Sequence, residues 1–261
     1  MNIKKLNLVY FSPTNGTEKI LKKISTAFKN IPTEEFNLTK VENISKKKFR
    51  NNECVIFGVP VYSGRVPDVV LERLKAFSGE NTLAVLVAVY GNRHYDDALL
   101  ELKNFVVEQG FKPISAGAFV ARHSFSTKDF PIAENRPDKN DLETAVNFGM
   151  EIFKKIQENN YDEVLVPGNF PLKPKSPRIN STPSTIEEKC TKCGKCKDVC
   201  PVDAIEINEI VKTNSDLCIK CMACVKICPV DARLILDEKL LKISKKLYLN
   251  LKEERKVEMF I

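Results

Sequence analysis

Eight of the nine cysteines in this 261-residue sequence fall into two runs near its C-terminal end. The first run has the spacing C-x2-C-x2-C-x3-C, is followed by a proline, and consists of Cys190, Cys193, Cys196 and Cys200. The second run has the same spacing and the same following proline, and consists of Cys218, Cys221, Cys224 and Cys228. Each cysteine therefore recurs 28 residues later, which indicates an internal duplication.

This spacing is typical of ligands to [4Fe-4S] clusters. Three thiolates so close in sequence wrap a short loop around one face of the cube, and the last corner needs the distal cysteine of the other run. The spacing predicts one cluster on Cys190, Cys193, Cys196 and Cys228. It predicts the second on Cys218, Cys221, Cys224 and Cys200. A zinc site made of four cysteines is the alternative, and the duplicated three-cysteine runs disfavour it.

Residues 186–237, which contain both runs, resemble the clostridial-type two-cluster ferredoxins. The resemblance implies a small α+β domain that carries low-potential electrons one at a time. One feature departs from that family, whose members tend to be strongly acidic. Here the acidic residues are nearly balanced by Lys189, Lys192, Lys195, Lys197, Lys220, Lys226 and Arg233.

The preceding part of the chain alternates apolar runs with amphipathic stretches. The apolar runs predict strands at residues 6–11, 54–60, 83–90 and 114–120, with a weaker one near 34–38. The stretches between them predict helices at 17–29, 67–77, 95–109 and 139–159. Near-continuous Val, Ile and Leu suit strands that are buried on both faces of a parallel sheet. We expect an α/β domain with a five-stranded, doubly wound parallel sheet.

Three polar loops follow predicted strands at their carboxyl ends, where open α/β sheets bind ligands. The first, at residues 12–17, enters a helix, whose unpaired N–H groups and dipole favour a phosphate. It contains no lysine or arginine, so hydrogen bonds would hold the anion. A capped helix without a ligand is the alternative for this loop taken alone. The other two loops lie at residues 60–67 and 90–97.

Together the three loops resemble those of flavodoxin, over residues 2–161, and the resemblance implies bound FMN. It implies phosphate binding by Ser12, Thr14, Asn15, Gly16 and Thr17. It implies that the flavin ring is approached by Pro60, Val61, Tyr62, Ser63, Gly64, Tyr90, Gly91, Asn92 and Arg93.

Two features depart from the flavodoxin pattern. Flavodoxins often read T-G-N-T where this chain reads Thr14-Asn15-Gly16-Thr17, so we expect Asn15 at the position of positive φ, which Asn tolerates. The chain has no tryptophan, which leaves Tyr62, Tyr90 and Tyr95 as the candidates to stack on the flavin. Of the other candidates, His123 is predicted to lie in a loop and Cys54 in the core.

The order of segments resembles the flavodoxin-ferredoxin fusions sometimes called ferrodoxins. We expect a flavodoxin-like FMN domain at residues 1–163, a proline-rich linker at 164–185, the ferredoxin domain at 186–237, and a helical tail at 238–261 that packs back on the protein. The implied function is to pass low-potential electrons between the clusters and FMN, and on to redox partner proteins such as ferredoxin-dependent oxidoreductases. The alternative is an FMN-dependent reductase of an organic substrate, with residues 121–140 as a lid. No catalytic residue is predicted, and the oligomeric state is left open.

The overall composition excludes other classes of function. The net charge of +7 is spread over mixed acidic and basic residues, and no basic stretch is interleaved with aromatics, so nucleic acid is not expected as a partner. No apolar run approaches the roughly 20 residues of a membrane helix. The N-terminus lacks the features of a signal peptide. We therefore expect a cytoplasmic protein in which the cysteines bind metal and do not form disulfides.

Overall fold

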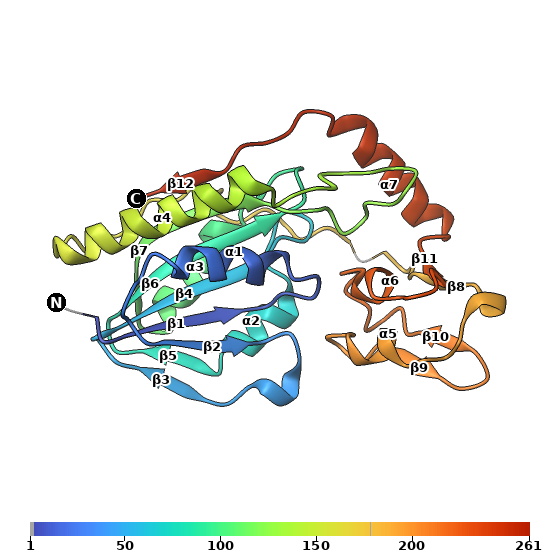
Figure 1. Cartoon of the computed structure of the whole chain (residues 1–261), viewed down its shortest axis with the longest axis horizontal. Helices are drawn as coiled ribbons and strands as arrows, with labels where there is room; N and C mark the ends of the chain where they lie inside the picture. The colour runs from blue at the N-terminus through green and yellow to red at the C-terminus, as the bar shows by residue number, and fades with distance from the viewer. Residues whose placement is uncertain (1–2, 178) are drawn as a thin grey trace.

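The computed structural model describes residues 3–177 and 179–261 of the chain. Its centre is a six-stranded sheet in the order β12-β7-β6-β4-β1-β2 (Figure 1). The parallel strands are β1 (Lys5–Tyr10), β2 (Thr33–Asn37), β4 (Glu53–Pro60), β6 (Thr82–Tyr90) and β7 (Phe111–Val120). Every residue of β4 and β6 is buried, as near-continuous apolar runs predict. The five parallel strands of the expected doubly wound sheet are confirmed, and the antiparallel β12, which makes the sheet six-stranded, was not expected.

Helices cover both faces of the sheet. On one face α1 (Gly16–Ser25) and α4 (Lys139–Gln157) contribute Ile20, Leu21, Phe148 and Ile152 to a buried cluster. On the other face α2 (Asp68–Leu74) and α3 (Ala98–Glu108) pack against a second cluster. A Cβ at Gly149 would lie 2.3 Å from the carbonyl oxygen of Ile24, so the crossing of α1 and α4 requires glycine.

Short elements complete this domain. The strands β3 (Lys47–Phe49) and β5 (Phe77–Gly79) form a separate parallel pair, and η1 (Val41–Asn43) is a single 3-10 turn. Asp138 and Asp141 form a capping box that starts α4. None of the helices in the described residues is long and apolar enough to cross a membrane.

The cysteine-rich part is small and built from two similar halves. After β8 (Ser184–Thr185) and η2 (Glu187–Lys189), the first half has α5 (Lys195–Asp198) and β9 (Ile205–Ile207). The second has β10 (Val211–Thr213), α6 (Ala223–Lys226) and β11 (Arg233–Leu234). β9 pairs with β10 and β11 with β8, both antiparallel. The helices and strands repeat at the same interval as the cysteines.

The C-terminal segment returns to the first sheet. Helix α7 (Glu238–Asn250) is capped by the Asp237 carboxylate, which accepts hydrogen bonds from two backbone N–H groups. The chain then runs back to β12 (Glu258–Phe260), which pairs antiparallel with β7 (Figure 1). The expected helical tail is therefore correct as far as Asn250 and wrong for residues 251–261. A three-residue strand is too short to show the period-2 alternation by which strands are recognised.

Candidate functional site

A cavity of about 600 Å³ lies where the α/β domain meets the cysteine-rich module, at the carboxyl ends of the parallel strands. All three predicted loops line it. Of the fourteen residues predicted to contact FMN, eleven line the cavity. The exceptions are Asn15, Gly64 and Asn92. The topology therefore brings together residues that are 80 positions apart in the sequence.

The first loop forms the N-terminal end of α1. Asn15 has φ 64°, the expected left-handed conformation, and α1 begins at Gly16. The Ser12 hydroxyl accepts a hydrogen bond from the Glu18 N–H at 3.0 Å, so it already caps the helix. The N–H groups of the first turn have no partner within the helix, and the helix dipole places positive charge at this end. This end of α1 suits the phosphate of FMN.

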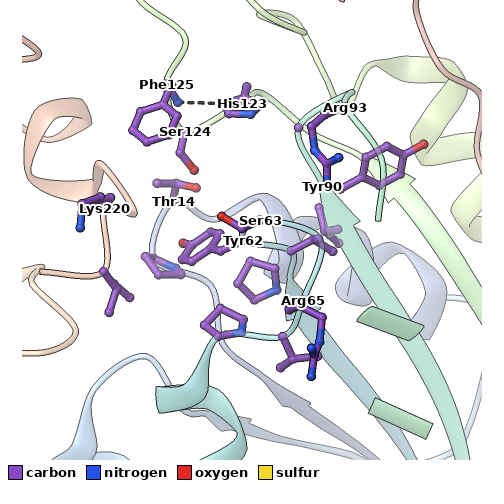
Figure 2. A pocket seen from close by; sticks show the side chains of 18 of the residues that line it. Thr14, Tyr62, Ser63, Arg65, Tyr90, Arg93, His123, Ser124, Phe125 and Lys220 are labelled. Atoms are coloured by element: carbon purple, nitrogen blue, oxygen red, sulfur yellow. Dashed lines mark hydrogen bonds between the residues drawn. The ribbon is translucent and has the colours of Figure 1, made fainter. Parts of the chain in front are cut away.

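The second loop is a tight hairpin. Tyr62 and Arg65 exchange two backbone hydrogen bonds, of 3.0 and 3.2 Å, and Ser63 and Gly64 between them have positive φ. A Cβ at Gly64 would lie 2.2 Å from Oδ2 of Asp96, so Gly64 allows the second and third loops to touch. Figure 2 shows the Tyr62 ring in the pocket beside Ser63. Burial raises the pKa of Tyr62 well above its usual value, and thiolates at Cys221 and Cys218 add to the rise.

The third loop holds the C-terminal tail. The buried Asn92 side chain donates to the carbonyls of Leu251 (3.3 Å) and Glu253 (2.9 Å) and accepts from the Arg255 N–H (2.8 Å). The Asn92 side chain thus binds the tail, and Asn92 does not line the cavity. The guanidinium of Arg93 pairs with Asp96 at the cavity wall.

The three tyrosines have different surroundings. Tyr62 and Tyr90 line the cavity and Tyr95 does not. The buried Tyr95 hydroxyl donates to a Glu258 carboxylate oxygen of the tail at 2.7 Å. In Figure 2 the Tyr90 ring points away from Tyr62, and its buried hydroxyl has no hydrogen-bond partner among the described residues. Tyr62 is therefore the candidate that best suits stacking on a ring.

The remaining wall lies outside the three loops predicted to contact FMN. It includes His123 to Phe125 after β7, Lys175 in the predicted linker, and Ile243 and Leu247 of α7. Residues 121–140 were considered only as a lid over an organic substrate. Lys175, Ile243 and Leu247 were missed because contacts between segments so far apart in the sequence leave no local signal.

His123 lies in a loop, as predicted, and is also part of the cavity wall. Its Nδ1 accepts a hydrogen bond from the Phe125 N–H at 3.0 Å (Figure 2). Burial, together with the charges of Lys226 and Arg93, lowers the pKa of His123 to about 4. The imidazole is therefore neutral at pH 7.

The loop at residues 121–140, expected as a lid, packs on the C-terminal half of the chain. Phe125 contacts the buried cluster of Met222, Ile235 and Leu240. The Phe130 ring centroid lies 5.9 Å from that of Tyr248 in α7. This loop therefore joins the α/β domain to α7 across the cavity.

The cysteines surround two further cavities, each much smaller. One is lined by Cys190, Cys193, Cys196 and Cys228. The other is lined by Cys200, Cys218, Cys221 and Cys224. These are the two sets of ligands that the spacing predicts, each with one cysteine from the other run.

The chemistry of the donors fits [4Fe-4S] clusters. The Ala204 N–H donates to Cys200 Sγ at 3.3 Å and the Ala232 N–H to Cys228 Sγ at 3.2 Å, as N–H groups do around cluster thiolates. In residues 3–177 and 179–261, no three Cys, His, Asp or Glu side chains are placed to hold a single metal ion, which is a different geometry from that of a cluster.

The two cysteine sites differ in their position. Cys218 lines both its own site and the large cavity; we call the site of Cys200, Cys218, Cys221 and Cys224 the proximal site. The site of Cys190, Cys193, Cys196 and Cys228 is the distal site; the residues that line it all belong to the cysteine-rich module, and Cys193 is exposed.

Comparison with known proteins agrees with this division. Residues 182–230 match the family described as the 4Fe-4S dicluster domain. A flavodoxin of Clostridium saccharobutylicum is 26% identical over 159 residues, which are 59% of this chain and 98% of that protein. The chain is a fusion of a flavodoxin-like domain and a 4Fe-4S dicluster ferredoxin domain. Both are electron-transfer domains, and the fusion implies electron transfer.

Solved structures with similarity to the flavodoxin-like domain have low sequence identity. Flavodoxin 1 from Bacillus cereus has a TM-score of 0.42 and 15% identity, and the match covers 57% of this chain and 97% of that one. Rubredoxin oxygen:oxidoreductase from Desulfovibrio gigas has a TM-score of 0.43 and 14% identity, with 60% of this chain covered. The chain spans only 37% of that enzyme.

Polar contacts hold the ferredoxin domain against the flavodoxin-like domain beside the proximal site. The Lys40 ammonium donates to the Cys200 carbonyl at 2.9 Å and pairs with Asp203 at 3.0 Å. The Arg73 guanidinium donates to the Pro201 carbonyl at 2.5 Å and to the Leu38 carbonyl in its own domain. Each cation thus reaches the Cys200 end of the first run, which supplies a thiol to the proximal site.

Proposed function

We propose that the protein passes low-potential electrons between two [4Fe-4S] clusters and FMN, and on to a redox partner protein. The observation that carries the proposal is a single cavity whose wall contains all three predicted FMN loops and also Cys218 of the proximal site. When bound, the clusters supply one-electron steps and the flavin supplies one- or two-electron steps. The protein supplies binding, orientation and electrostatics.

We assign the phosphate of FMN to the first loop and its ring to the cavity beside Tyr62. The first-turn N–H groups of α1 would bind the phosphate, with Thr14 and Thr17 lining the cavity beside them. Tyr62 would stack on the ring, because it lines the cavity next to the loop that carries Cys218. His123, neutral at pH 7, would present an uncharged edge to the bound flavin.

The positions of the two cysteine sites indicate an order for electron transfer. The distal site is the one with an exposed cysteine, so a partner protein would approach it there. The proximal site shares the cavity wall with the flavin loops. We therefore propose that the partner protein exchanges electrons at the distal site, and that the proximal site connects the distal site to the flavin.

The first test is the cofactor content of protein purified without oxygen. We expect one FMN and about eight irons per chain, as two [4Fe-4S] clusters require. About eight irons without flavin would refute the FMN assignment and leave the cluster assignment in place.

The second test is the rate of flavin reduction by dithionite, followed by stopped-flow absorbance in protein that retains FMN. We expect Cys218→Ser, which removes a proximal ligand at the cavity wall, to slow flavin reduction at least tenfold. The matched control is Cys54→Ala, because Cys54 is fully buried in the flavodoxin-like core and burial raises the pKa of its thiol to about 12. Equal rates in wild type and Cys218→Ser would show that the flavin is not reduced through the clusters.

A further inference from the structure

The two halves of the ferredoxin domain differ at one buried position. Ile205 of the first half and Arg233 of the second are separated by the same 28 residues as the cysteines, and each is 2% exposed. Their strand partners correspond as well, because Ile205 pairs with Thr213 and Arg233 pairs with Thr185. The duplication has therefore kept the framework and placed a buried cation in one half only.

The Arg233 guanidinium lies between the two cysteine sites. It donates to the hydroxyls of Thr185 and Thr213, both at 2.7 Å, and to Cys224 Sγ at 3.6 Å. Cys224 belongs to the proximal site, while Arg233 itself also lines the distal cavity. Its contacts thus join both halves of the duplication.

In the part of the chain that the structure describes, no carboxylate pairs with Arg233. By contrast, the guanidinium of Arg65 pairs with Glu101 at 2.6 Å, and that of Arg73 donates to the Leu38 carbonyl. Its Nε has no hydrogen-bond partner either. A buried charge without a counter-charge is strongly destabilising. Thiolate-ligated clusters on either side, which carry net negative charge, would supply the missing counter-charge.

We propose that Arg233 raises the reduction potential of both clusters, and that of the proximal cluster more. Reduction adds one electron to a cluster and neither forms nor breaks a bond, so a fixed positive charge nearby stabilises the reduced form. Hydrogen bonds to cluster sulfurs act in the same direction. Arg233 reaches both sites by its charge, but donates a hydrogen bond to a sulfur of the proximal site alone. This inference rests on the cluster ligation in the proposed function and is independent of FMN.

The consequence concerns electron transfer between the two clusters. Cys221 and Cys224 of the proximal site are buried, whereas Cys193 of the distal site is exposed. An added electron is less stable in a buried, low-dielectric site than in an exposed one. Arg233 offsets this penalty, so that transfer from the distal to the proximal cluster is not opposed by burial.

The test is a potentiometric titration of the anaerobic full-length protein, followed by electron paramagnetic resonance. A paramagnetic relaxation agent in the buffer broadens the signal of the exposed distal cluster and so assigns the two midpoints. The main variant is Arg233→Ile, which copies the residue of the first half. We expect both midpoints to fall. At a fixed potential the reduced-to-oxidised ratio of the proximal cluster should fall at least tenfold, which is 59 mV for one electron, with a smaller change at the distal cluster.

Two further variants serve as controls. One separates the effect of the charge on the reduction potential from that of the hydrogen bonds, and the other compares a buried charge with an exposed one. Arg233→Gln keeps donor groups without the charge and should give an intermediate shift; it also serves as the measurement if Arg233→Ile assembles fewer than about eight irons. Lys195→Gln removes an exposed cation from the distal cavity wall and should change the ratio less than twofold at either cluster, since solvent screens it.

Unchanged midpoints in Arg233→Gln and Arg233→Ile would overturn the proposal, as would a larger shift at the distal cluster. Iron analysis keeps this outcome distinct from failure of the proposed function, because protein with two clusters and no flavin still yields both midpoints.

Discussion

A substitution at Asn92 tests whether its side chain holds the C-terminal tail or contacts the flavin. Its side chain makes three hydrogen bonds to residues 251–255. Each hydrogen bond contributes about 1 kcal/mol net, so losing all three should cost roughly 3 kcal/mol of local stability. Since 1.4 kcal/mol is a factor of ten, the opening equilibrium of the tail should rise roughly 150-fold.

The variant to use is Asn92→Gly. Asn92 has φ 64°, a conformation that alanine adopts only with strain and glycine adopts freely. The matched control is Asn81→Gly, because Asn81 also has positive φ (55°) but is exposed and lies in the turn before β6. The two variants make the same change in composition and in backbone freedom.

Hydrogen exchange of the amides of residues 255–260 measures the opening directly. We expect roughly 150-fold faster exchange there in Asn92→Gly, by the estimate above, and wild-type exchange in Asn81→Gly. Unchanged protection in Asn92→Gly would refute the reasoning that these bonds hold the tail. Loss of FMN with full protection of the tail would instead favour the ring contact predicted from the sequence.

Two further predictions concern the contacts between the domains and the response to pH. Arg73→Ala removes the hydrogen bond to the Pro201 carbonyl, so the amide protons of Cys200, Val202 and Asp203 should exchange several-fold faster and flavin reduction should slow. The exposed Lys75→Ala should change neither. Equal exchange in both variants would contradict the role of Arg73. Burial lowers the pKa of His123 to about 4. As the pH falls, the imidazole of the unfolded chain therefore binds a proton before that of the folded chain does. The contribution of the neutral His123 to the free energy of unfolding is therefore complete above about pH 6.5 and is lost as the pH falls from about 6.5 to 4. The thermal unfolding midpoint should fall less over this range in His123→Gln than in wild type, and parallel pH profiles would refute the assignment.

The sequence was most informative where the chemistry requires local spacing. The two cysteine runs predicted which four thiols would meet, and the structure brings together those two sets. Apolar runs located β1, β4, β6 and β7 because buried strands read as continuous Val, Ile and Leu. The prediction of β2 was weaker because its residues, Thr33–Asn37, are polar apart from Phe36 and are not buried. The Thr14-Asn15-Gly16-Thr17 order predicted a positive φ at Asn15, which is confirmed.

What the sequence did not reveal depends on contacts between distant segments. Ile243 and Leu247 line the cavity only because α7 crosses it. Asn92 was expected at the flavin, and its side chain is turned to a tail that lies about 160 residues further along the chain. Arg233 was counted only among the cations that balance the acidic residues, whereas its pairing with Thr185 and its fully buried position follow from the fold of the duplicated halves.

The return of the chain to β12 makes the ferredoxin domain an insertion and not an appendage. Both of its ends are anchored in the flavodoxin-like domain, one through the segment that follows α4 and the other through the strand paired with β7. A carrier tethered at one end can swing between partners, whereas one tethered at both ends keeps a nearly fixed distance to the site it serves. The same topology means that the domains cannot be cut apart cleanly, because a protein that ends at residue 163 would leave β7 as an open edge, available for pairing with another chain.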